Sequence, residues 1–386
     1  MVGILAVLVL LGTNPSENAR TIQAALDARS AAGGGRVTVP AGTWPTGTIR
    51  LRNKVDLHLE KGAVLLASPN LADYNSPDEY PENWPCPSEG WNACHLVIGH
   101  RVTGASITGE GVIDGNADVF FEDKVEHPEW AKIGWANGIR RQKDKVNLRP
   151  GQLIVFVKSR QLKIEGLTVR NSTCWSLFFH GCDDVTVRDY TVRNKATDLN
   201  TDGIDIDCCS DVLVEHADID TGDDAIAIRG SQRHLGLEKP CERIRIRDCV
   251  LSAYAMGIRI GVGDGLIRDV DISNVKVRHG AWGVSFDCWY GKKEQAGVDI
   301  EGVRIRDSRF DGCYENWRFR LGGDRQEFGV RDVSFTNCTF TSPKPGTTEY
   351  LGKRPLQNVR FDNCRWSPAA DNPFNETAFG NNCLCP

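Results

Sequence analysis

The stretch VTVRDYTV (residues 185–192) decides the fold, because it joins two short apolar–polar alternations through a single polar turn. Alternation of β-branched with polar residues is typical of strands that bury one face, and Asp is a common turn residue. Seven further copies start 23 to 33 residues apart: LKIEGLTV (162–169), VLVEHADI (212–219), IRIRDCVL (244–251), VDISNVKV (270–277), VRIRDSRF (303–310), VSFTNCTF (333–340) and VRFDNCRW (359–366). Units of this length in a fixed order indicate a solenoid.

Several units contain a second alternating segment. These segments are WSLFFHGC (175–182), GIDID (203–207), AIAIRG (225–230), GIRIG (257–261) and GVSFD (283–287). No apolar period of 3.6 residues is sustained through the units, which excludes a helical solenoid, and a β-sandwich would not keep this internal order. The sequence therefore predicts an all-β, right-handed parallel β-helix in which each unit is one coil, stacked about 4.8 Å above the last.

The N-terminal part predicts a cap for this stack. ENARTIQAALDARSAAGGG (17–35) is the one amphipathic helix, with Ile22, Ala25 and Leu26 on one face and a run of glycines at its end. A helix there would cover the open strand edge of the first coil. The apolar run MVGILAVLVLL (1–11) is too short to span a bilayer and fits a first buried strand or a targeting segment. We expect one domain over residues 1–386, with a cap over 1–35 and a tail from about 367.

Composition limits the partners of the chain. It has 386 residues, 40% of them hydrophobic, and a net charge of −5, which argues against nucleic acid or an anionic membrane as the main partner. The 14 cysteines lack the spacing of a zinc site, so no metal or other cofactor is expected. Five of them are expected at one place of the repeat, as small buried residues: Cys182, Cys249, Cys313, Cys338 and Cys364. We expect a monomer, secreted or periplasmic, although no clear signal peptide is visible.

Two Asp clusters, NTDGID (200–205) and GDDAIAIRG (222–230), lie just before successive second segments. On adjacent coils they would bring Asp202, Asp223 and Asp224 together on one outer face. Like charges so close are unfavourable unless one is protonated or a ligand binds. A protonated and an ionised carboxyl group are what hydrolysis of a glycosidic bond requires. General acid–base catalysis is the favoured interpretation; cation binding and simple turns remain open alternatives.

The alternation also divides these segments into inward and outward columns. The inward columns would hold Ile204, Ile226 and Ile258, together with the isoleucine two positions after each of them. The outward columns would hold Asp205, Ala227, Arg259 and Ser285 in one file, and His180, Asp207, Arg229, Gly261 and Asp287 in the next.

At these motifs the sequence resembles the polygalacturonases and rhamnogalacturonases of glycoside hydrolase family 28. The likeness covers most of the chain and includes TIQAALD (21–27), ITGEGVIDG (107–115), RP (149–150), and Asn171, Ser172 and Trp175; NTDGID and GDDAIAI are its most specific parts. The resemblance implies single-displacement hydrolysis with inversion. It implies Asp223 as the general acid, and Asp202 with Asp224 as the groups that activate water. Coil stacking alone would put these carboxyls about 5 Å apart, whereas an inverting enzyme needs roughly 6.5–9.5 Å.

Two departures from that family concern the substrate. Met256 stands where the family has His, and Ser285 with Asp287 stand where it has an Arg-x-Lys pair that holds a sugar carboxylate. We therefore expect a neutral sugar at that subsite and slow cleavage of polygalacturonate. The expected substrate-binding residues are Asn200, His180, Arg229, Met256, Arg259, Asp287, Arg318 and Arg320, the last two in a loop-like stretch with Trp317 and Arg325.

The insertion DEYPENWPCPSEGWN (78–92), rich in Trp and Pro, is predicted to form one wall of a cleft. The sequence thus favours a hydrolase of galacturonide or rhamnogalacturonan glycans. The alternatives are a β-helical polysaccharide lyase, which would need calcium and a basic Arg or Lys, and a glycan-binding solenoid without activity.

Overall fold

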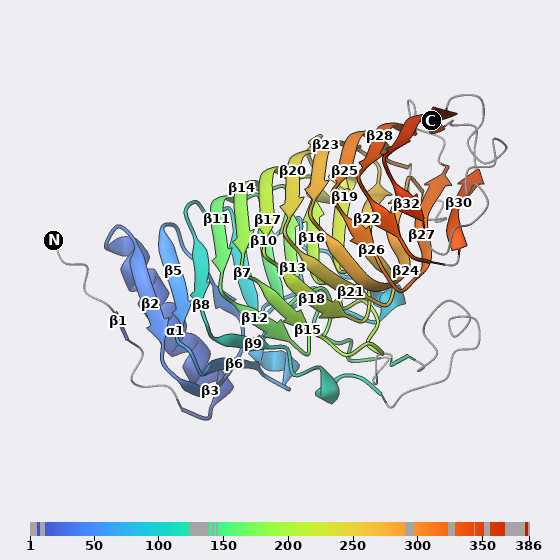
Figure 1. The fold of residues 1–386 in the computed structure, drawn as a ribbon. Coiled ribbons are helices and arrows are strands. Elements are labelled where there is room, and N and C mark those ends of the chain that lie inside the picture. Colours follow the sequence, from blue (N-terminus) through green and yellow to red (C-terminus); the bar gives the residue numbers. More distant parts are fainter. Residues whose placement is uncertain are drawn as a thin grey trace.

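The computed structural model describes residues 6–7, 12–122, 139–140, 143, 146–289, 297–322, 329–342, 344–350, 356–366 and 383–384. The chain winds into a stack of coils in which neighbouring strands pair in parallel (Figure 1). The coils follow the sequence from the helix α1 at one end to the last strands at the other. This confirms the predicted right-handed parallel β-helix.

The strands form three faces that run along the stack. The first face consists of β1 (Ala6–Val7), β2 (Gly35–Val39), β5 (Val55–Leu59), β8 (Ser106–Gly109), β11 (Arg160–Glu165), β14 (Asp183–Arg188), β17 (Ser210–Glu215), β20 (Cys241–Arg247), β23 (Leu266–Ser273), β25 (Asp299–Arg306), β28 (Val330–Thr336), β31 (Leu356–Asp362) and β33 (Cys383–Leu384). The second face consists of β3 (Gly42–Thr46), β6 (Ala63–Ala67), β9 (Val112–Asp114), β12 (Thr168–Arg170), β15 (Thr191–Arg193), β18 (Asp218–Thr221), β21 (Val250–Ala253), β26 (Arg309–Phe310), β29 (Thr339–Phe340) and β32 (Arg365–Trp366).

The third face carries the two Asp clusters. Its strands are β4 (Ile49–Arg50), β7 (Val97–His100), β10 (Ile154–Val157), β13 (Leu177–His180), β16 (Ile204–Asp207), β19 (Ile226–Gly230), β22 (Met256–Gly263), β27 (Cys313–Leu321) and β30 (Lys344–Tyr350). The long strand β24 (Lys276–Asp287) bends from the second face into the third, since it pairs with β21 and β26 on one and with β22 and β27 on the other. Short helical turns lie in the connections: η1 (Leu71–Asp73), η2 (Pro87–Glu89), η3 (Ala117–Val119) and α3 (Gln232–Leu235).

The register of the third face places like residues above one another. Ile204 pairs with Ile226 and Ile226 with Ile258, and all three are fully buried. The outward files are also as predicted: Asp205 pairs with Ala227, which pairs with Arg259. Because side chains alternate with a period of two, this register fixes which residues reach the core and which reach the outer surface.

The corner between the first and second faces explains the polar residue within each repeat. That residue has a positive φ, a conformation that Asp and Asn tolerate better than most residues. The column consists of Asp189, His216, Asp248, Asn274, Asp307, Asn337 and Asn363. Side chains link successive coils there, as Asn274 donates to Asp248 (2.7 Å) and Asn363 to Asn337 (2.7 Å).

The cysteines only partly follow the prediction. Twelve cysteines from Cys86 to Cys364 lie in the described part of the chain, and ten of them are buried. Cys249, Cys338 and Cys364 occupy one column, directly after the corner residues with positive φ. Cys182 instead lies at the corner between the third and first faces, and Cys313 begins a strand of the third face, so the expectation of one place was wrong for these two.

The helix α1 (Pro15–Ala31) covers the N-terminal end as expected (Figure 1). Asn14 caps it by accepting a hydrogen bond from the backbone N–H of Glu17 (3.1 Å). Ile22 and Leu26 are fully buried against the first coils, and Ala25 packs beside them. Within the described part of the chain, no helix is both long and apolar enough to cross a membrane.

One continuous apolar core runs from Ile22 to Phe361. It corrects one expectation, because ENWRFRL (315–321) is strand β27 and not a loop. Trp317 and Phe319 point inward and are buried, so Trp317 cannot stack on a sugar. The alternation of apolar residues in this stretch is the period of a strand with one face in the core. Arg325 and most of the tail from residue 367 lie outside the described residues.

Candidate active site

The three predicted acidic residues meet on the third face. Asp202 precedes β16 and Asp223 with Asp224 precede β19, two strands that pair in register on adjacent coils. The backbone ladder continues through them, since Gly203 N–H donates to the carbonyl of Asp224 (2.8 Å). One carboxylate oxygen of each residue lies within 4.8 Å of the other two. The local geometry follows directly from coil stacking.

The acidic cluster is largely removed from solvent. Asp202 and Asp224 are buried, while Asp223 is partly exposed. Burial and then the charge of Asp224 raise the pKa of Asp223 to about 7. Burial and then the charges of Asp205, Asp223 and Asp224 raise the pKa of Asp202, and burial raises that of Asp224. Burial thus favours the protonated form of all three carboxyls, and their cationic neighbours oppose it.

Arg229, on β19, is the neighbour of Asp202. Its guanidinium donates to Asp202 (3.0 Å) and to Asp205 (2.6 Å), and it lies over the ring of Trp175 at 4.5 Å. Burial alone would lower the pKa of Arg229, but the charges of Asp205 and Asp202 raise it on balance. This ion pair favours the ionised form of Asp202.

Arg259, on β22, is the neighbour of Asp224. Its Nε lies 3.0 Å from Asp224 and 3.4 Å from Asp287, and its Nη2 contacts the sulfur of Met256 at 3.0 Å. The backbone N–H of Met256 donates to Asp224 at 3.1 Å. Asp224 therefore has one guanidinium and one backbone donor, both of which favour its ionised form.

Asp223 differs from both of its neighbours. It accepts a hydrogen bond from the backbone N–H of Asn200 (2.9 Å), and no ion pair joins it to a described cation. The side chain of Asn200 is held by Arg149, whose Nη2 donates to it (2.9 Å). Asp223 is thus the partly exposed carboxyl group of the three, and its pKa of about 7 suits proton donation near neutral pH.

Asp287 and Ser285 do not have the environment that the sequence predicted. Asp287 is fully buried and accepts two hydrogen bonds from Arg318 (2.9 and 3.1 Å) and one from Ser285 (3.0 Å). Arg318 also lies 3.9 Å from the ring of Trp282. Asp287 is therefore neutralised by guanidiniums and does not line the cavity, so the predicted repulsion of a uronate by Asp287 is corrected.

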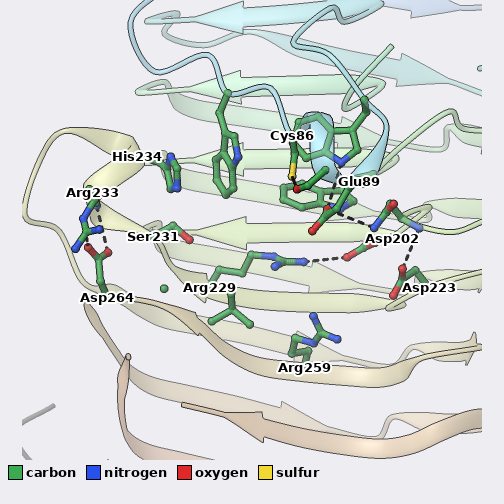
Figure 2. A pocket seen from close by; sticks show the side chains of 17 residues that line it. Cys86, Glu89, Asp202, Asp223, Arg229, Ser231, Arg233, His234, Arg259 and Asp264 are labelled. Carbon is green, nitrogen blue, oxygen red and sulfur yellow. Dashed lines mark hydrogen bonds and ion pairs between the residues drawn. The ribbon is translucent and has the colours of Figure 1, made fainter. Parts of the chain in front are cut away.

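A cavity of about 580 Å³ opens beside the acidic cluster (Figure 2). Asp202 and Asp223 lie at one end, Arg229 along its floor, and His234, Arg233 and Asp264 at the other end. The lining residues are Trp84, Cys86, Ser88, Glu89, Trp91, Trp175, Asn200, Asp202, Asp223, Arg229, Ser231, Arg233, His234, Arg259, Val262, Gly263 and Asp264.

Residues 78–92 form one wall of this cavity, as predicted. Trp91 is buried in a separate aromatic cluster with Trp175 and Phe178. The segment is also anchored by Glu82, whose carboxylate contacts Lys158 (2.5 Å) and Arg101 (3.2 Å). The wall is therefore fixed to the third face by packing and by charge.

The structure distributes the predicted substrate-binding residues unevenly. Asn200, Arg229 and Arg259 line the cavity. Four others do not line it: Met256, Asp287, Arg318 and Arg320. Of these, Met256 and Asp287 contact Arg259, and Arg318 pairs with Asp287. Arg320 pairs with Glu349 (3.2 Å) away from the cavity.

His180 is fully buried, with its ring 6.3 Å from that of Trp84. Burial lowers the pKa of His180. The prediction that His180 contacts a sugar is corrected, because packing against the wall removes the ring from the surface.

Several cavity residues were not predicted. Glu89 accepts from Trp91 Nε1 (3.3 Å) and from Asn200 Nδ2 (3.5 Å). Arg233 lies 3.4 Å from Asp264, and His234 stacks on Trp84. Glu89 lies in the segment predicted as a wall, whereas residues 231–240 form an irregular insertion without a motif that could have identified them.

The carboxylate spacing does not follow the general rule for inversion. Inverting enzymes usually separate their carboxyls by roughly 6.5–9.5 Å to leave room for water. Here one oxygen of each carboxylate lies within 4.8 Å of the others. The stereochemistry thus rests on the family resemblance and not on this distance.

Comparison with known proteins agrees with this site. The model of glycosyl hydrolases family 28 matches residues 88–239. A probable polygalacturonase of Vitis vinifera is 26% identical over 304 residues, 76% of this chain and 56% of the relative, so the match spans little more than half of that protein. An endo-polygalacturonase of Pectobacterium carotovorum subsp. carotovorum is 26% identical over 328 residues, 77% of this chain and 79% of the relative.

Among solved structures, a hyperthermoactive exopolygalacturonase from Thermotoga maritima has a TM-score of 0.72 at 22% identity, covering 94% of this chain and 86% of that one. This is a likeness of fold. The residues matched by the model of glycosyl hydrolases family 28 include Asp202, Asp223 and Asp224 and most of the residues that line the cavity, so the chain is similar to this family at the candidate site.

Proposed function

We propose that the protein hydrolyses a glycosidic bond in a pectin-type glycan, of the galacturonide or rhamnogalacturonan kind. One observation carries the proposal: three carboxyl groups meet beside one cavity, where Asp202 pairs with Arg229 and Asp224 with Arg259, whereas Asp223 lines the cavity and accepts a hydrogen bond from the backbone N–H of Asn200. We assign Asp223 as the proton donor and the two ion-paired carboxyls as the acceptors.

In the proposed reaction Asp223 donates its proton to the glycosidic oxygen as the bond to the anomeric carbon breaks. Asp202 and Asp224 accept a proton from the water that attacks this carbon. The leaving sugar thus gains a hydroxyl group and the anomeric carbon gains the water oxygen. Arg229 and Arg259 stabilise the ionised acceptors. A proton then returns from the acceptors to Asp223 through solvent, which restores the starting state.

The residues give no support to a lyase. A lyase needs a neutral base to remove a proton from the sugar ring; among the described residues, the basic side chains beside the acidic cluster are Arg229 and Arg259, while His234 lies at the other end of the cavity. The carboxylates around Arg229 raise its pKa, which keeps that guanidinium protonated. A glycan-binding solenoid without activity would not require a carboxyl group whose pKa is raised to about 7 beside two that pair with guanidiniums.

The charges of the cavity bear on the substrate. Each of its three arginines contacts a carboxylate: Arg229 with Asp202, Arg233 with Asp264, and Arg259 with Asp224. A sugar carboxylate would have to share a guanidinium that is already paired. This supports the expectation that a glycan containing neutral sugars is a better substrate than polygalacturonate.

The test is to incubate the protein with polygalacturonate and with rhamnogalacturonan oligosaccharides, and to measure new reducing ends and absorbance of unsaturated products. Release of reducing ends without that absorbance is the expected result. Absorbance would indicate a lyase, and no release from either glycan would contradict the proposal. NMR of the first product anomer decides between inversion and retention.

A further inference from the structure

A contact between two insertions lines the end of the cavity away from the acidic cluster. Trp84 belongs to the wall segment 78–92, and His234 belongs to α3, which follows β19. Their rings are parallel within 7°, with centroids 3.9 Å apart. Figure 2 shows His234 opposite the acidic residues Asp202 and Asp223. The contact therefore lies at the end of the cavity opposite the acidic cluster.

Both sides of this contact are held in place. In α3, Leu235 is fully buried, Gln232 donates to the backbone carbonyl of Asp264 (3.1 Å), and the backbone N–H of Arg233 donates to the Asp264 carboxylate (3.2 Å). On the other side, Trp84 makes an edge contact with Trp175 at 5.9 Å. The end of the cavity is thus a built wall and not the chance approach of two side chains.

The cavity is large enough for a short piece of a glycan. Its volume of about 580 Å³ lies within the range of roughly 300–1,000 Å³ for pockets that enclose most of one small ligand.

We propose that the Trp84–His234 contact makes this cavity a dead-end pocket that admits the end of a glycan chain, so that the enzyme releases short products of one size from chain ends. This inference rests on the proposed hydrolase function and deepens it. Trp84 and His234 are specificity-determining residues, because they limit how far the chain extends past the acidic cluster, and they take no part in proton transfer.

The experiment follows product sizes by chromatography during cleavage of a pectin-type polymer, together with its viscosity. The wild-type protein should release a single small product from the start while viscosity falls slowly. His234→Ala and Trp84→Ala should each raise the share of longer products about two- to tenfold, the factor that corresponds to loss of an aromatic contact.

His234 is exposed, so its variant should fold normally. Leu237→Ala is the matched control, because Leu237 is 53% exposed in the same insertion and does not line the cavity.

The outcomes separate the two proposals. If the wild-type protein gives a mixture of lengths at once with a rapid loss of viscosity, the dead-end pocket is wrong although hydrolysis is established. If both variants keep the single product of the Leu237→Ala control, the contact does not set product size and the inference is overturned. If no pectin-type glycan is cleaved at all, the proposed function itself fails.

Discussion

Arg259 offers a sharp test of the charge distribution, because its Nε lies 3.0 Å from the carboxylate of Asp224. Replacing it in Arg259→Gln leaves Asp224 buried with a backbone hydrogen bond from Met256 and no guanidinium within 3.0 Å. Removing one partner of a buried ion pair typically costs about 3–5 kcal/mol. Asp287 should tolerate the change better, since it keeps both hydrogen bonds to Arg318.

The magnitude follows from the ionisation of Asp224. Without Arg259, burial raises the pKa of Asp224 with less opposition, so a smaller share of this carboxyl carries the charge that activates water. A cost of 3 kcal/mol corresponds to about a hundredfold change in an equilibrium, so kcat/KM at pH 6 should fall by a hundredfold or more. Activity should partly recover as the pH rises, until Asp223 loses its proton near pH 7.

The assay is a pH profile of kcat/KM on the best pectin-type oligosaccharide. Arg320→Gln is the matched control, because Arg320 is an ion-paired arginine of the same face outside the cavity, and it should behave like the wild type. An Arg259→Gln enzyme with the wild-type profile and a loss of less than about threefold would refute the assignment of Asp224 as an acceptor.

Three further outcomes are expected. In urea unfolding, Asp223→Asn should have a higher free energy of unfolding than the wild type at pH 8, by on the order of 2 kcal/mol. The gain over the wild type should be smaller at pH 5. The reason is that burial raises the pKa of Asp223 to about 7, so the folded wild type loses stability as pH rises from the ordinary pKa of an Asp to about 7; equal gains at both pH values would contradict it. A chelator should leave turnover unchanged, because Arg229 and Arg259 already compensate the carboxylates; loss of activity would indicate a bound cation. Initial rates should be higher on rhamnogalacturonan oligosaccharides than on polygalacturonate, and the reverse order would show that a paired arginine still binds a uronate.

Local patterns were sufficient to predict the fold. Alternation in GIDID and AIAIRG determines which residues point inward, and stacking of like units then brings Asp202, Asp223 and Asp224 together without further information. The corner residues with positive φ are recognisable because Asp and Asn recur there. The same alternation marks Trp317 as a core residue, so its assignment to a loop was an error of interpretation and not a limit of the sequence.

The rest of the site depends on contacts between segments with no fixed relation in sequence. Asp287 is neutralised by Arg318 from the next coil, and that pairing depends on the register between β24 and β27. Trp84 meets His234 across 150 residues, because two irregular insertions happen to cover the same strands. Neither contact follows from a local pattern, and both change the expected specificity.

The most direct test of the account is the dependence of Asp223→Asn on the leaving group. Because Asp223 is assigned only the protonation of the leaving oxygen, the variant should lose roughly 10²–10⁴-fold in kcat on a pectin-type oligosaccharide. On a dinitrophenyl glycoside of the same sugar, which needs no proton to depart, it should stay within about tenfold of the wild type. Comparable losses on both substrates, or near-normal cleavage of the oligosaccharide, would contradict the assignment of Asp223 as the general acid.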